Sequence, residues 1–94
     1  MNDYILKVKV KNMESSRGNT IPNQFIIITD VGQYFQSYDS TIAVTTKDGK
    51  TYLDETYWDY STTTGKYRNI FLGETKKETE AKIKSGEYKL IKLN

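Results

Sequence analysis

Apolar and polar residues alternate along the start of this chain in the pattern of a sheet protein. In residues 6–11 every second residue is apolar, which is typical of a strand with one buried face. We therefore expect Leu6, Val8 and Val10 to be buried. The residues between them should project from the opposite, exposed face of the strand: Lys7, Lys9 and Lys11.

Residues 12–30 change from a polar segment to a strongly β-forming one. Residues 12–23 are polar, include Gly18 and the only proline, and predict a long flexible loop. Residues 24–30 form a β-branched and aromatic run that is too short for a helix. Such a run predicts a strand that is buried on both faces.

Three further strands are expected before residue 55, separated by turn signals. They are predicted at 33–38, 41–46 and 51–54, where β-branched and aromatic residues recur. Asp48-Gly49 predicts a two-residue hairpin turn, because both central positions of that turn need positive φ. Residues 24–54 would then form a four-stranded antiparallel meander.

The last forty residues carry the helical signals. Tyr67, Ile70 and Phe71 follow helical spacing, with Ser61 or a following threonine as N-cap and Gly73 as the stop. A second short helix is predicted from the capping-box residues of 75–78 to Ser85-Gly86, and 87–93 returns as a strand. The predicted fold class is α+β: a mostly antiparallel sheet of five to six strands with one or two short helices on one face, in a single domain over 1–94. Since the helices follow a meander, a parallel βαβ sheet is not expected.

Composition removes several kinds of chemistry. The chain has neither Cys nor His, which excludes disulfide scaffolds, zinc fingers and Ser-His or Cys nucleophiles. No apolar run approaches membrane-spanning length and no signal peptide is recognised, so a cytoplasmic protein without a membrane partner is expected. Residues 12–65 hold three basic against seven acidic residues, whereas 66–94 hold eight against four. We expect no catalytic residue, no metal and no cofactor.

Two groups of residues are candidate binding sites. Aromatic residues crowd the segment 52–71, and we expect Trp58, Tyr67 and Phe71 in the core. The remainder of that region predicts a partner-binding surface, because Tyr and Arg are enriched at binding hot spots: Tyr57, Tyr60, Arg68, Asp54 and Asp59. A structural role remains open for the carboxylates, which can cap a turn or pair with Lys66 or Arg68.

The second candidate site is a row of lysines on the first predicted strand. Lys7, Lys9 and Lys11 repeat every ~6.8 Å, close to the spacing of phosphates along a single nucleic-acid strand. Nearby aromatic residues would complete a platform for single-stranded nucleic acid. The same lysines can instead protect an exposed sheet edge from pairing with another chain.

The stretch from Asn23 to Asn94 resembles a family of short uncharacterised phage and mobile-element proteins of Gram-positive bacteria. The resemblance is carried by NQFIIITD, YFQSYDSTIA, YLDETYWDYSTTTGKYRNIFLGE and SGEYKL. It implies a mobile-element origin and a bacterial host cytoplasm, and it supplies no catalytic residues. The expected function is therefore a small non-catalytic binding protein that modulates a host factor, for instance a defence nuclease in the manner of anti-CRISPR proteins. The alternative is a nucleic-acid-binding module.

Overall fold

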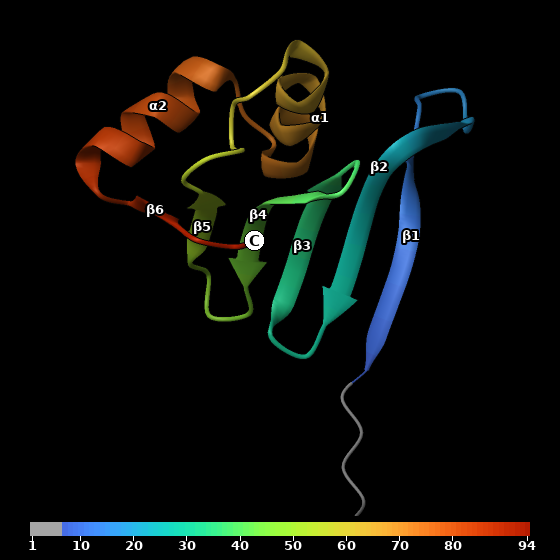
Figure 1. Cartoon of the computed structure of the whole chain (residues 1–94), viewed down its shortest axis with the longest axis horizontal. Coiled ribbons are helices and arrows are strands. Elements are labelled where there is room, and N and C mark those ends of the chain that lie inside the picture. The colour runs from blue at the N-terminus through green and yellow to red at the C-terminus, as the bar shows by residue number, and fades with distance from the viewer. Residues whose placement is uncertain (1–6) are drawn as a thin grey trace, which may run out of the picture.

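A computed structural model describes residues 7–94 as one open six-stranded sheet with two helices (Figure 1). The strands follow each other across the sheet in chain order. The elements are β1 (Val8–Glu14), β2 (Thr20–Thr29), β3 (Gly32–Ser37), β4 (Ser40–Thr46), β5 (Thr51–Asp54), α1 (Thr62–Leu72), α2 (Lys76–Ser85) and β6 (Tyr88–Ile91). The predicted α+β class, the number of strands and both helices are confirmed.

The first hairpin is longer than the sequence pattern predicts. The predicted loop over 12–23 is mostly strand, since β1 continues to Glu14 and β2 begins at Thr20. The turn is confined to 15–19, where Ser15 accepts a bond from the Gly18 amide. Polar residues are tolerated in these strand ends because they alternate with Met13 and Ile21, which pack in the core, while Glu14 and Thr20 face solvent. Leu6 lies outside the described residues.

The hairpin between β4 and β5 forms where predicted but with another turn. Lys47, Asp48 and Gly49 make a three-residue loop, in which the Gly49 amide donates to Thr46 O at 3.0 Å. Gly49 has a φ of 88°, whereas Asp48 is not among the residues with positive φ. This geometry is a type I turn followed by one left-handed residue, so the two-residue hairpin prediction is wrong in detail.

Both helices begin and end at the predicted residues. Ser61 caps α1, and Thr75 with Glu78 forms the capping box of α2. Gly73 and Gly86 end the two helices in the left-handed conformation. The two helices form the crossover connection between β5 and β6, and these two strands pair in parallel. The sheet is therefore an antiparallel meander with one parallel strand pair at its β6 edge.

The core lies between the sheet and the helices. One buried cluster is Met13, Phe35 and Ile42, and a second is Ala43, Leu53 and Tyr88. Phe71 of α1 packs against both clusters, and its ring stacks on Phe35 at 5.7 Å between centroids. The helix-covered face is therefore centred on β3, β4 and β5, and the β1–β2 hairpin extends past it.

Candidate functional site

The predicted site around residues 54–68 begins with Asp54, at the end of β5. Asp54 is 2% exposed. Its Oδ2 accepts bonds from the amides of Thr56 (3.0 Å) and Tyr57 (2.8 Å), and its Oδ1 from the Leu93 amide (2.8 Å). Burial alone would raise the pKa of Asp54, but these bonds outweigh it and hold the pKa below its usual value. Asp54 thus fixes the turn after β5 to the C-terminal segment and has no surface for a partner.

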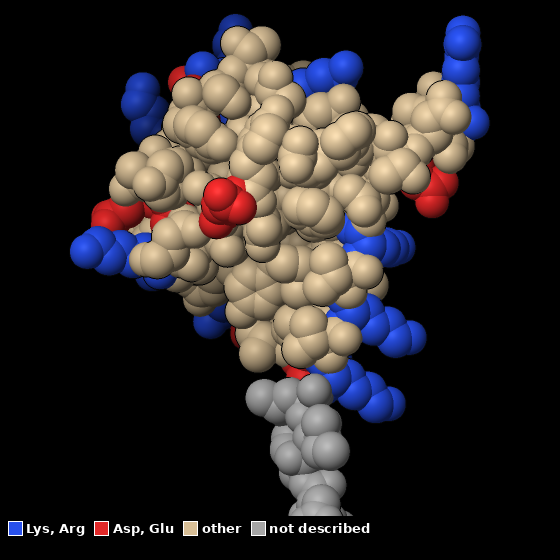
Figure 2. Space-filling view, turned by 45° about the vertical axis from the view of Figure 1, so that its right-hand side comes forward, with Lys and Arg blue, Asp and Glu red and all other residues tan. Residues whose placement is uncertain are grey.

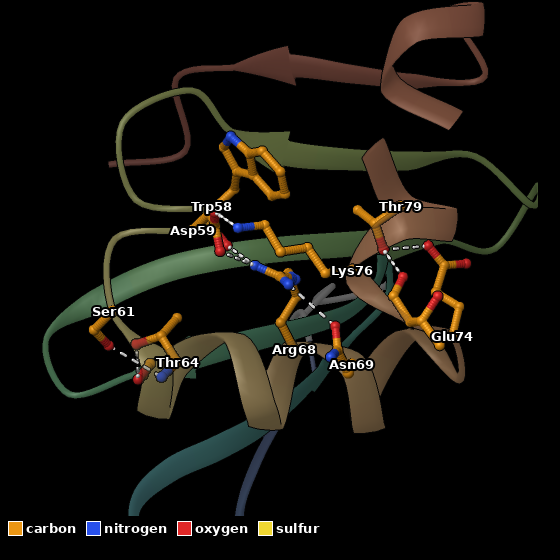
Figure 3. A network of polar contacts seen from close by, with 11 residues as sticks. Trp58, Asp59, Ser61, Thr64, Arg68, Asn69, Glu74, Lys76 and Thr79 are labelled. Atoms are coloured by element: carbon orange, nitrogen blue, oxygen red, sulfur yellow. Dashed lines mark hydrogen bonds and ion pairs between the residues drawn. The ribbon is translucent and has the colours of Figure 1, made fainter. Parts of the chain in front are cut away.

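Arg68 points from α1 into the protein, as Figure 3 shows. It is fully buried. Its Nη1 donates to Trp58 O at 2.6 Å and to Asp59 Oδ1 at 3.0 Å, and its Nη2 to Asn69 Oδ1 at 3.1 Å. The guanidinium also lies 5.1 Å from the centre of the Trp58 ring. Arg68 therefore anchors the segment between β5 and α1 and does not reach solvent.

Asp59 connects the two helices through opposite charges. Besides Arg68, it binds Lys76 of α2, with Nζ 2.7 Å from Oδ2 (Figure 3). Burial would raise the pKa of Asp59, but the bonds from Lys76 and Arg68 hold it below the usual value. The bond to Asp59 raises the pKa of Lys76. These groups line a shallow surface depression of about 660 Å³ together with Tyr60, Lys66 and the start of α1.

The aromatic residues of this segment divide between core and surface. Tyr57 is half-buried against the Met13 cluster, and Trp58 is half-buried against the Leu53 cluster. Tyr60 is 46% exposed and meets Tyr57 edge to face at 5.4 Å. Of the two tyrosines predicted for the partner-binding surface, Tyr60 alone is exposed. Their role in binding a partner stays a prediction.

The structure contains a second polar network, around Glu74, that no sequence motif indicates. Glu74 accepts bonds from Thr79, from Lys82 Nζ at 2.8 Å and from the Tyr88 hydroxyl at 2.7 Å. Burial would raise the pKa of Glu74, but these three donors lower it. Burial and Glu74 together raise the pKa of Tyr88. The network joins the α1–α2 connection to α2 and β6; its members are spread over fifteen positions, so no local motif reveals it.

The face of the sheet opposite the helices carries a continuous row of apolar side chains. Cross-strand partners share a face, and the register links one residue from each of five strands. We call these residues the open row: Val10, Ile27, Tyr34, Val44 and Tyr52. Val44 is 4% exposed, Val10 is 61% exposed, and the other three residues are half-buried.

The β1 edge differs from the prediction in one respect. Lys7, Lys9 and Lys11 are exposed as expected, but Val8 and Val10 are 60% and 61% exposed rather than buried. Lys9 and Lys11 pair with Ile28 and Ile26, so the lysines share the helix-side face, beyond the reach of the helices. Figure 2 shows basic side chains projecting from this edge beside a broad area with few charges.

Residues 7–94 contain neither a metal-ligand cluster nor a membrane-spanning helix. No group of three or more His, Cys, Asp or Glu residues in this range is placed to hold a metal ion. Neither described helix has the length and apolar composition needed to cross a membrane.

Comparison with known proteins finds one family. The model of a family of unknown function (DUF8033) matches residues 8–87, which include β1 to β5 and both helices and end just before β6. No curated protein and no solved structure matches the sequence.

Proposed function

This chain belongs to the DUF8033 family of unknown function, and we propose that it is a non-catalytic binding protein that contacts another protein through the helix-free face of its sheet. The open row is the observation that supports this most. In a two-layer domain an apolar sheet face is normally covered by a second layer. A partly exposed apolar surface that no second layer covers is typical of an interaction site.

The proposed partner is a protein of a bacterial host. The sequence resemblance to phage and mobile-element proteins supports a role in modulating a host factor, and inhibition of a defence nuclease is its narrower form. A non-catalytic role is supported by the lack of His and Cys. It is also supported by Asp54, Asp59 and Glu74, whose carboxylates are all engaged in bonds that hold the fold.

Nucleic-acid binding is a second candidate, favoured by one observation. Lys7, Lys9 and Lys11 are all exposed on one strand face, and none of the ion pairs within residues 7–94 that join Lys or Arg to Asp or Glu at 2.7–4.0 Å includes them. However, the register places Tyr34 and Tyr52 on the opposite face from these lysines. A stacking platform needs aromatic and basic groups on one surface, so protein binding is the better-supported proposal.

Affinity capture from a bacterial host lysate tests the proposed surface. The bait is the full chain, compared with Tyr34→Thr/Tyr52→Thr, which removes two rings from the open row and keeps β-forming residues. We expect the double variant to capture about tenfold less, or even less, of a host protein that the wild type captures. A loss of this size is typical when central aromatic contacts of an interface are removed. Nuclease treatment of the lysate should leave the capture of that protein unchanged.

A matched control removes apolar surface from the other side of the molecule. Ile70 of α1 is 57% exposed, and Ile70→Thr should retain the captured protein. Thermal melts of each bait confirm that the comparison is made between folded proteins. Equal capture by the wild type and the double variant would refute the proposed surface. A nuclease-sensitive capture with a steep fall in salt would support nucleic-acid binding instead.

A further inference from the structure

The β1 edge combines three properties that together define a partner's chemistry. β1 is the outermost strand, so no described strand pairs with its outer side. It is seven residues long, and its pairing with β2 is regular from Val8 to Asn12. Its alternate backbone N–H and C=O groups therefore face outward over a length that another strand can match.

The two faces of this edge differ sharply in chemistry. One face presents three exposed lysines, and the other presents Val8 and Val10 at 60% and 61% exposure. A strand added beside β1 places its residues opposite these side chains, alternately on each face. Matching both faces requires an acidic residue opposite each lysine and an apolar residue opposite each valine.

We propose that β1 accepts an extended segment of a partner protein in which acidic and apolar residues alternate, and that this segment becomes a seventh strand of the sheet. This inference rests on the proposed function and names the partner's binding element. Added strands gain affinity from backbone bonds and specificity from alternate side chains. Val10 also belongs to the open row, so the added strand continues the apolar face outward.

The charges argue against the other occupants of this edge. A second copy pairing β1 with β1 would bring two rows of lysines together, and like charges opposite each other are destabilising. The other sheet edge is less suited to an added strand. β6 has only four residues, and the chain beyond it folds back, with Asn94 bonded to Thr41 on both its amide atoms.

The test uses three synthetic peptides of defined pattern: Glu-Val-Glu-Val-Glu-Val-Glu, the same residues grouped as Val-Val-Val-Glu-Glu-Glu-Glu, and Lys-Val-Lys-Val-Lys-Val-Lys. Each is titrated against the full chain by fluorescence anisotropy, with amide chemical shifts recorded in parallel. We expect the alternating acidic peptide to bind at least about fivefold more tightly than the grouped peptide. The shift changes should be confined to β1 and its neighbour β2.

Charge reversal on β1 should reverse the preference. Lys9→Glu/Lys11→Glu is expected to weaken binding of the alternating acidic peptide by about five- to thirtyfold and to favour the lysine peptide. The matched control is Lys66→Glu/Lys77→Glu, which changes the same number of exposed charges on the helices. This control should still bind the alternating acidic peptide more tightly than the lysine peptide. An alternating acidic peptide with N-methyl groups along one edge keeps its charges but loses backbone bonds, and should bind more weakly.

Several outcomes would overturn the inference. If the grouped or the N-methylated peptide binds as tightly as the unmodified alternating acidic peptide, the binding is electrostatic attraction without strand addition. Tighter binding of a single-stranded oligonucleotide at the same lysines would assign this edge to nucleic acid, and self-association lost on charge reversal would assign it to a second copy. If no peptide binds while host-protein capture still depends on Tyr34 and Tyr52, strand addition fails and the proposed function stands.

Discussion

At the scale of single residues, the site is built around a cation that the protein does not expose. Arg68 is fully buried, and its Nε has no partner within the described residues, whereas Nη1 and Nη2 are bonded. A planar fork can bind Trp58 O, the Asp59 carboxylate and the Asn69 amide oxygen at once, which a lysine ammonium at the same position cannot reproduce. Arg68 therefore holds the segment that precedes α1, through Trp58 and Asp59, against the helix itself.

We expect Arg68→Met to destabilise the fold by about 2–4 kcal/mol, because Asp59 and Trp58 O lose their buried donor. Lys76→Ala removes the other cation of Asp59, but from an exposed position, and should cause a much smaller loss. Urea denaturation at pH 7 measures both. Equal losses in the two variants would show that burial of Arg68 does not matter to its role.

Three hydrogen-bonded carboxylates give the free energy of unfolding a defined dependence on pH. The pKa values of Asp54, Asp59 and Glu74 all lie below their ordinary values of 3.8, 3.8 and 4.5. As the pH falls through the ordinary values, the unfolded chain takes up protons before the folded one does. The contribution of these groups is therefore present at neutral pH and is lost progressively in acid, down to their folded pKa values.

We expect the free energy of unfolding to decrease from pH 6 to pH 3, and Asp54→Asn to reduce that decrease. The variant should also be less stable than the wild type at neutral pH, because an amide oxygen replaces only part of the three backbone bonds. Denaturant titrations at several pH values provide the measurement, with the exposed Glu55→Gln as control. An unchanged pH profile in Asp54→Asn would contradict this assignment.

At the scale of elements, the sequence predicts the features that neighbouring residues determine. The caps at Ser61 and Thr75, the stops at Gly73 and Gly86 and the meander strands depend on neighbouring residues, and all are found. The burial of Arg68 and Asp54 depends on contacts with segments as far away as Leu93, which no window of sequence contains. The exposure of Val8 and Val10 depends on which face of the sheet the helices cover, which alternation alone does not reveal.

The β4–β5 turn gives a direct test of element geometry. Gly49 adopts a φ of 88°, a region that β-branched residues rarely adopt, although a Cβ there would meet open space. Gly49→Val should therefore destabilise the domain by about 1–3 kcal/mol through backbone strain alone. Gly49→Asn should cost less, because asparagine tolerates the left-handed region. Thermal melts of the two variants decide this, and equal melting temperatures would exclude strain as the cause.

At the scale of the whole molecule, stability and binding are assigned to different parts of the sheet. The helices cover β3, β4 and β5, where Phe35, Ala43 and Leu53 are fully buried. The first part of β1, residues 8–11, lies beyond this layer and exposes side chains on both of its faces, whereas Met13 near the end of β1 is in the core. A fold arranged in this way can change its outer strand without losing its core.

This separation predicts that Val8→Thr/Val10→Thr leaves the fold intact while weakening binding. Both valines are about 60% exposed, and threonine keeps the β-branched shape, so the free energy of unfolding should change by no more than about 0.5 kcal/mol per site. Affinity for the alternating acidic peptide should fall by about three- to tenfold, because two cross-strand apolar contacts are weakened. Leu53→Thr is the opposite control, since it removes a fully buried side chain and should destabilise the domain severely. If the double valine variant unfolds as readily as Leu53→Thr, β1 belongs to the core and its valines cannot be reserved for a partner.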